Sequence, residues 1–209
     1  VNPELIQDTL FQEREKLVSS GIEEQNLGEW TLSLVEISDD EWAHSWKNYW
    51  HPQKISEKVV ICPSWEEYKA GNDEIIINLD PGSAFGTGCH ATTRLCVQAL
   101  EKIVPEFPSA EIADVGTGSG ILAVVGIKLG AEFAVGVDND ASVISVAEEN
   151  AEKNNAAHKC KFYTGVATDI KGEYEIVTAN ILAHVLIEAM PDLVRLMKQN
   201  GKLILSGII

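Results

Sequence analysis

The chain has 209 residues, of which 16 are basic and 32 acidic, and its formal net charge is −16. This acidity argues against direct nucleic-acid binding, which needs clustered Lys and Arg, and it is compatible with a basic protein partner. No apolar run approaches the ~20 residues of a membrane span and no signal peptide is visible, so we expect no membrane association. The 4 cysteines form no C-x-x-C pair, which favours reduced thiols and a cytoplasmic location.

The first part of the chain has too little regular structure for a core of its own. Apolar spacing predicts a helix over residues 4–20, and alternation predicts a strand over 30–37. One helix and one strand cannot enclose a core, so we expect residues 1–37 to be the remnant of an N-terminal domain. Ser38 and Glu41 form a predicted capping box that begins a second helix, and 38–57 is therefore expected to be a helical linker.

From residue 58 onward, the sequence predicts alternating strands and helices. We expect strands over 59–62, 74–79, 111–116, 133–138, 160–164, 174–180 and 202–207, and helices over about 92–104, 119–129, 140–153 and 182–198. Such alternation predicts an α/β fold with a doubly wound parallel sheet, which binds ligands beyond the carboxyl ends of its strands. Sheets of this class usually carry further strands, so the domain over 58–209 is expected to lack its last ones.

A glycine-rich run joins the predicted strand 111–116 to the next helix. It reads Asp114-Val115-Gly116-Thr117-Gly118-Ser119-Gly120, and Asp138 follows Gly116 by 22 residues. A parallel sheet holds adenosine-containing cofactors with such a unit, because the glycines admit the ligand and the acid accepts hydrogen bonds from the ribose. The G-x-G-x-G spacing and the preceding acid suit the cationic S-adenosylmethionine better than a pyrophosphate. The alternative interpretation is a tight turn without a ligand.

Further candidates come from the ends of neighbouring elements. Asn180 ends a predicted strand and is the candidate catalytic residue, which would hold an amine through its side-chain oxygen; the alternative is a turn former. Thr93 is expected either to contact the methionyl part of the cofactor or to cap a helix. Phe85 either covers the cofactor or packs within its loop. Asp114 is expected to order the glycine loop.

Several motifs together resemble those of one family, the bacterial ribosomal protein L-eleven methyltransferases, which are PrmA-type protein lysine methyltransferases. The resemblance covers roughly residues 39–209. It rests on Trp46-Lys47 with His51-Pro52, Ile61 to Trp65, Asp80 to Thr93, Asp114 to Leu122, and Asn180 to Ala183. The segment from Asp80 to Thr93 is highly specific, although Cys89 and Ala91 stand where Thr and Pro would be expected.

The resemblance implies a class I S-adenosylmethionine-dependent methyltransferase with a Rossmann-like fold. It implies N-methylation of lysine ε-amines and of the N-terminal α-amine of a basic large-subunit ribosomal protein, with residues 1–37 ending a substrate-recognition domain. It also implies cofactor contacts at Thr93, Gly116, Asp138 and Asn180, to which we add Gly118, Gly120, Phe85 and Asp114; no metal is expected.

Three alternatives stay open. A methyltransferase of nucleic-acid amino groups is disfavoured by the acidity, and because no aromatic residue follows Asn180 to stack on a flipped base. A nicotinamide-dependent oxidoreductase is disfavoured by the glycine spacing. The third alternative is a non-catalytic module that keeps the fold and the cofactor for assembly only.

Overall fold

The computed structural model describes residues 3–28, 30, 50–80 and 90–208. The chain divides into two units, residues 1–49 and 50–209. The first contains helix α1 (Pro3–Ser19) and the short helix η1 (Glu24–Asn26), so the helix expected over 4–20 is confirmed. The strand expected over 30–37 and the helix expected from Ser38 lie outside the described residues, apart from Trp30 and residues 50–57. The assignment of residues 1–37 to a recognition domain stays a prediction.

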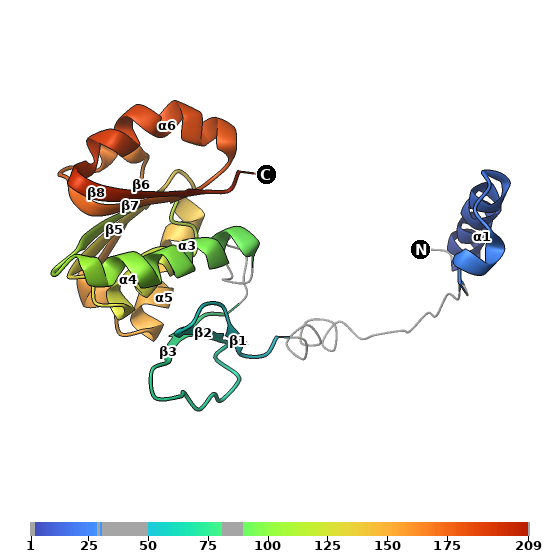
Figure 1. Cartoon of the computed structure of the whole chain (residues 1–209), viewed down its shortest axis with the longest axis horizontal. Helices are drawn as coiled ribbons and strands as arrows, with labels where there is room; N and C mark the ends of the chain where they lie inside the picture. The colour runs from blue at the N-terminus through green and yellow to red at the C-terminus, as the bar shows by residue number, and fades with distance from the viewer. Residues whose placement is uncertain (1–2, 29, 31–49, 81–89, 209) are drawn as a thin grey trace. The chain divides into compact units, whose positions relative to one another are not determined.

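The second unit is built on a five-stranded parallel sheet (Figure 1). Its strands lie in the order β6-β5-β4-β7-β8, and every neighbouring pair is parallel. Their bounds are β4 (Glu111–Val115), β5 (Phe133–Asp138), β6 (Cys160–Thr164), β7 (Tyr174–Asn180) and β8 (Met197–Ser206). The chain runs outward from β4 through β5 and β6, then returns to the other side of β4. The switch point therefore lies between β4 and β7, where sheets of this kind bind ligands.

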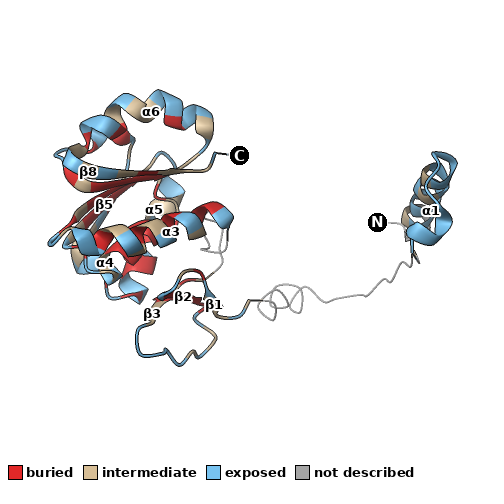
Figure 2. Ribbon diagram, viewed as in Figure 1, coloured by how far each residue is buried: buried red, intermediate tan, exposed pale blue. Residues whose placement is uncertain are grey.

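Helices cover both faces of this sheet (Figure 1). Helices α3 (Ala91–Ile103), α4 (Ile121–Lys128) and α5 (Ala141–Lys153) lie on one face, and α6 (Ala183–Arg195) lies on the other. Successive strand residues point to opposite layers, so Ile112 packs toward the first group and Ala113 toward α6. Because both faces are covered, the central strands are almost continuously buried (Figure 2). The connectors η3 (Val104–Glu106), η4 (Ala157–Lys159) and η5 (Ala167–Asp169) complete this unit.

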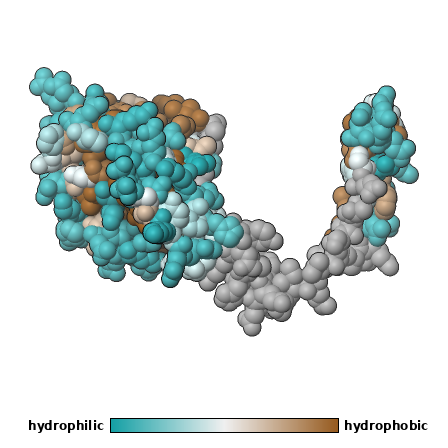
Figure 3. All heavy atoms as spheres, turned by 60° about the horizontal axis from the view of Figure 1, so that its bottom comes forward, coloured by the Kyte–Doolittle hydropathy of each residue, from teal (hydrophilic) through white to brown (hydrophobic). Residues whose placement is uncertain are grey.

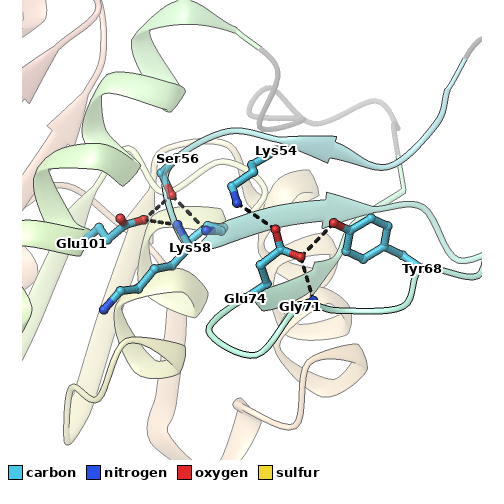
Figure 4. Close-up of polar contacts among 8 residues, drawn as sticks. Lys54, Ser56, Lys58, Tyr68, Gly71, Glu74 and Glu101 are labelled. Atoms are coloured by element: carbon cyan, nitrogen blue, oxygen red, sulfur yellow. Dashed lines mark hydrogen bonds and ion pairs between the residues drawn. The ribbon is translucent and has the colours of Figure 1, made fainter.

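A smaller sheet precedes α3 in the chain. Strand β1 (Gln53–Lys54) is antiparallel to β2 (Val59–Cys62), which is parallel to β3 (Ile75–Asn78). Gln53 and Lys54 thus form a strand within the range expected as a helical linker. Glu74 holds this sheet together by accepting hydrogen bonds from Lys54 at 2.7 Å, Tyr68 at 2.8 Å and the Gly71 amide at 2.9 Å (Figure 4).

One face of α3 fastens the small sheet to the rest of the unit. Glu101 accepts hydrogen bonds from the Ser56 hydroxyl and the Lys58 amide (Figure 4). Arg94 donates to the Lys54 carbonyl at 2.9 Å, and Gln98 donates to the Ile55 carbonyl at 3.2 Å. The residues of α3 involved are spaced at three and four positions, which places them on one side of the helix. These hydrogen bonds therefore hold α3, including its N-terminal end, against residues 54–58.

Most expected elements begin and end within two residues of their observed bounds, but the last two do not. Helix α6 ends at Arg195 rather than 198, and β8 begins at Met197 rather than 202. The strand starts early because Met197 pairs with Tyr174, and Tyr174 donates its amide to the Leu196 carbonyl at 2.7 Å. Asn200, at a φ of 68°, lies within the strand near its register shift instead of ending the helix.

Candidate active site

A pocket of about 720 Å³ lies at the carboxyl edge of the large sheet. Its lining includes residues from the start of α3, the glycine turn after β4, the tip of β5 and the end of β7. The sequence predicts that these four segments meet at this edge of the sheet. Of the sequence-predicted site residues, those lining the pocket are Thr93, Gly116, Gly118, Asp138 and Asn180. Phe85 lies outside the described residues.

The floor of the pocket is the backbone of the glycine turn. The amides of Gly116 and Thr117 donate to the Val137 carbonyl at 2.8 and 2.9 Å, which holds the turn against β5. Gly116 has a φ of 72°, and a Cβ at this position would strike the Ile181 side chain. A residue with a side chain would therefore be strained and would also have to push the Ile181 side chain aside. The absence of side chains lets a ligand approach the backbone closely.

Asp114 lies beneath the turn and not in the pocket wall. Its side chain is 1% exposed and accepts hydrogen bonds from the hydroxyls of Thr178 at 2.5 Å and Thr117 at 2.7 Å. Burial raises the pKa of Asp114 to about 6, although the two hydroxyls oppose the shift. Asp114 thus ties the turn to β7, and its effect on a ligand is indirect. Gly120 also does not line the pocket; it precedes α4 as its N-cap, with a φ of 76°.

Asp138 ends β5 and lies against the glycine turn at the edge of the pocket. Its Oδ2 accepts a hydrogen bond from the Gly118 amide at 2.9 Å, and its Oδ1 accepts one from the Asp140 amide at 3.1 Å. Each carboxylate oxygen can accept more than one hydrogen bond, so both oxygens can still accept hydrogen bonds from the hydroxyls of a ligand. The contacts also fix the carboxylate in one orientation at the rim.

Asn180 and Thr93 meet on the other side of the turn. Thr93 is fully buried, and Asn180 donates through Nδ2 to its hydroxyl oxygen at 3.3 Å. Asn180 Oδ1 is buried and has no hydrogen-bond partner among the described residues. Native proteins rarely leave a buried acceptor unsatisfied, so this atom marks a place for an N–H or O–H donor. Thr93 does not cap α3, because His90 occupies the N-cap position and accepts from the Thr92 amide at 3.4 Å.

The sequence reasoning missed two walls of the pocket. The segment after β6 contributes Gly165 to Thr168, and α6 contributes Glu188, Ala189 and Asp192. Arg195 joins these two walls by donating to the Ala167 carbonyl at 2.9 Å. The signal for the first wall was present, because β6 ends at the same sheet edge as β4, β5 and β7. No short sequence motif marks the residues of α6 that line the pocket.

The described part of the chain has neither a cluster of metal ligands nor a membrane-spanning helix. No group of three or more His, Cys, Asp or Glu side chains there is arranged to hold a metal ion. Within the same residues, no helix is both long enough and apolar enough to span a bilayer.

The visible surface of the second unit is mostly hydrophilic, with apolar atoms gathered in a few patches (Figure 3).

Comparison with known proteins places these features in context. The sequence model of the family described as ribosomal protein L11 methyltransferase (PrmA) matches residues 6–209. A relative named ribosomal protein L11 methyltransferase, from Alkaliphilus oremlandii, is 43% identical over 88% of this chain and 58% of its own length. One of the same name from Desulfitobacterium hafniense is 41% identical over 98% of this chain and 66% of its own length. The chain thus spans about three fifths of the curated relatives it matches.

A solved structure supports the same relationship. The crystal structure of a ribosomal protein L11 methylase from Lactobacillus delbrueckii subsp. bulgaricus matches with a TM-score of 0.69 and 37% identity, and the match covers 76% of this chain and 81% of that one. The doubly wound α/β fold expected from the sequence is therefore the class I methyltransferase fold.

Proposed function

The chain belongs to the ribosomal protein L11 methyltransferase (PrmA) family, and from this premise we propose that it acts as an S-adenosylmethionine-dependent protein N-methyltransferase. The proposed substrate is the basic large-subunit ribosomal protein L11, modified at lysine ε-amines and at the N-terminal α-amine. The proposal includes a cytoplasmic location and no direct contact with nucleic acid. The observation that most supports it is the meeting of Gly116, Asp138 and Asn180 around one pocket at the switch point.

The residues of the pocket fit the proposed cofactor. Asp138 would hold the ribose hydroxyls, because its oxygens keep acceptor capacity at the rim. The bare backbone at Gly116 and Gly118 would admit the methionyl part, and Thr93 and Asn180 would flank it. When bound, S-adenosylmethionine supplies an electrophilic methyl group on a cationic sulfur. Asp114 and Gly120 would contribute by holding the turn in shape.

The role proposed for Asn180 is to orient the acceptor amine. A neutral amine carries N–H donors, and the buried Oδ1 of Asn180 is an acceptor without a partner among the described residues. This hydrogen bond would leave the nitrogen lone pair free to point at the methyl group, about 3–3.5 Å away in a reactive arrangement. Asn180 is uncharged, so it favours the protonated amine less than a carboxylate at the same position would.

The surroundings would also help the amine lose its proton. A free lysine has a pKa near ~10.4, and removal from water lowers that pKa. Much of the pocket wall is apolar, with Val115, Ile121, Leu122 and Ile181 among its residues. Desolvation there, together with a cationic ligand, would favour the neutral amine, and no strong general base is then required. The net charge of −16 would assist the approach of a basic substrate.

The test is methyl transfer to purified ribosomal proteins. The chain is incubated with S-adenosylmethionine labelled in the methyl group and with total large-subunit proteins, and labelled bands are identified by mass spectrometry. The proposal predicts label on lysines or the N-terminus of L11, with little label when Asp138→Ala replaces the native chain. Label in ribosomal RNA, supplied in a parallel incubation, would favour the nucleic-acid alternative. Cofactor binding without transfer to any component would favour the non-catalytic module.

A further inference from the structure

Helix α5 packs directly behind the glycine turn. A Cβ built on Gly120 would lie 2.9 Å from the Ala147 Cβ, so helix and turn are in close contact. Asn150, one turn further along the same buried face, donates its Nδ2 to the Ser119 carbonyl at 2.8 Å. Ser119 and Asn150 are both 4% exposed, so neither group has ready access to water. The bond therefore forms inside the protein.

This contact acts on one peptide unit of the turn. The peptide between Ser119 and Gly120 is held on its N–H side by the Thr117 carbonyl, at 2.9 Å, and on its carbonyl side by Asn150. Ser119 and Gly120 flank the unit, and the glycines on either side of Ser119 have φ values of 52° and 76°, which glycine adopts at little cost. The two glycines thus give the turn more backbone freedom than residues with side chains would. Asn150 supplies a donor from outside the turn that restrains the plane of this peptide.

A second amide on the same helix supports the first. Asn154 donates to the Asn150 backbone carbonyl at 2.8 Å, and it also exchanges two 2.8 Å hydrogen bonds with the Asn78 backbone at the end of β3. Asn154 is 2% exposed, so its burial matches that of Asn150. Within the described residues, the hydrogen bonds of its side chain go to Asn78 and Asn150 and not to the turn, which makes Asn154 a natural control.

We propose that Asn150 is a positioning residue for the methyl donor, acting through the Ser119 carbonyl to fix the glycine turn on which the donor lies. The inference rests on the proposed function of this pocket. Loss of the bond would remove this restraint from the buried Ser119 carbonyl and give the Ser119–Gly120 peptide more freedom to rotate. Gly118 and Thr117, which line the pocket, would then sample other positions. Donor affinity should fall even where the fold is kept.

The test compares Asn150→Ala with Asn154→Ala by calorimetric titration of the full chain with S-adenosylhomocysteine. Both variants lose a buried amide from the same helix face, so both should lower the thermal midpoint. We expect Asn150→Ala to weaken binding about 5- to 10-fold, the equivalent of one hydrogen bond, and Asn154→Ala to change it less than about 2-fold. Asn150→Leu keeps the side-chain volume but has no donor, so it replaces Asn150→Ala in the test if the alanine variant does not fold. We expect it to weaken binding by the same factor.

Two results would overturn the inference. One is native affinity in both Asn150 variants, and the other is an equal loss in the Asn150 and Asn154 variants, which would indicate a general packing effect. A native chain that binds no S-adenosylhomocysteine would contradict the proposed function itself, so the two failures are distinguishable.

Discussion

At the scale of single residues, Asp138 should govern donor affinity. Asp138→Ala removes a charged acceptor from the rim and also releases the Gly118 amide at 2.9 Å. We expect the binding free energy of S-adenosylhomocysteine to weaken by about 1–3 kcal/mol, as when hydrogen bonds to a charged group are lost. Isothermal titration calorimetry measures this directly, and unchanged affinity would count against the ribose assignment.

Asn180 should matter more for turnover than for binding. Asn180→Ala deletes the acceptor Oδ1, which has no partner among the described residues, and the contact with Thr93. We expect kcat to fall about 100-fold, as for other preorganised groups that act in the transition state, with a much smaller change in donor affinity. Single-turnover kinetics separates the two quantities. Equal losses in both would reduce Asn180 to a cofactor contact.

The raised pKa of Asp114 predicts that the stability of the fold depends on pH. Its pKa is raised from 3.8 to about 6, so the folded chain retains a proton that the unfolded chain releases. Stability contributed by this group is present below about pH 4 and is lost as pH rises to about 6. Asp114→Asn, which still bonds to hydroxyls, should be more stable than the native chain above pH 6, by about 1–3 kcal/mol.

The measurement is the difference in thermal midpoint between the Asp114→Asn variant and the native chain, taken from pH 4 to pH 8. The difference should grow in favour of the variant up to about pH 6 and then level off, because only Asp114 differs between the two proteins. A difference that is flat with pH would show that Asp114 titrates at its ordinary pKa.

At the scale of elements, the glycine turn can be tested with a matched pair. Gly116 and Gly130 both have positive φ values, 72° and 114°, but only a Cβ on Gly116 would meet another side chain, that of Ile181. Both alanine variants should lose about 1–2 kcal/mol of stability from the left-handed backbone. Only Gly116→Ala should also abolish donor binding. Retained binding in Gly116→Ala would mean that the turn does not form the pocket floor.

At the scale of the whole molecule, the sequence predicts the sheet and the edge at which most candidate site residues lie, because both follow from local patterns. Strand β5 and the acid at its end, Asp138, were expected at their observed positions, since alternation and spacing place them without tertiary information. Asn180 was found for the same reason, as the residue that ends a strand at the ligand-binding edge.

What the sequence did not predict depends on packing between distant segments. The wall formed by α6 through Glu188 and Asp192 follows from how that helix crosses the sheet, which no short motif encodes. Asp114 was expected near the ligand, but its hydrogen bond to Thr178, 64 residues away, places it beneath the turn. The early start of β8 follows from pairing with β7 and not from the helix-like spacing of its first residues.

The central claim is that the pocket between β4 and β7 binds an adenosyl sulfonium compound and not a dinucleotide. Calorimetric titration of the chain with S-adenosylmethionine and, separately, with NADH tests it most directly. We predict saturable 1:1 binding of S-adenosylmethionine and no measurable heat with NADH. Binding of NADH in its place would contradict the account.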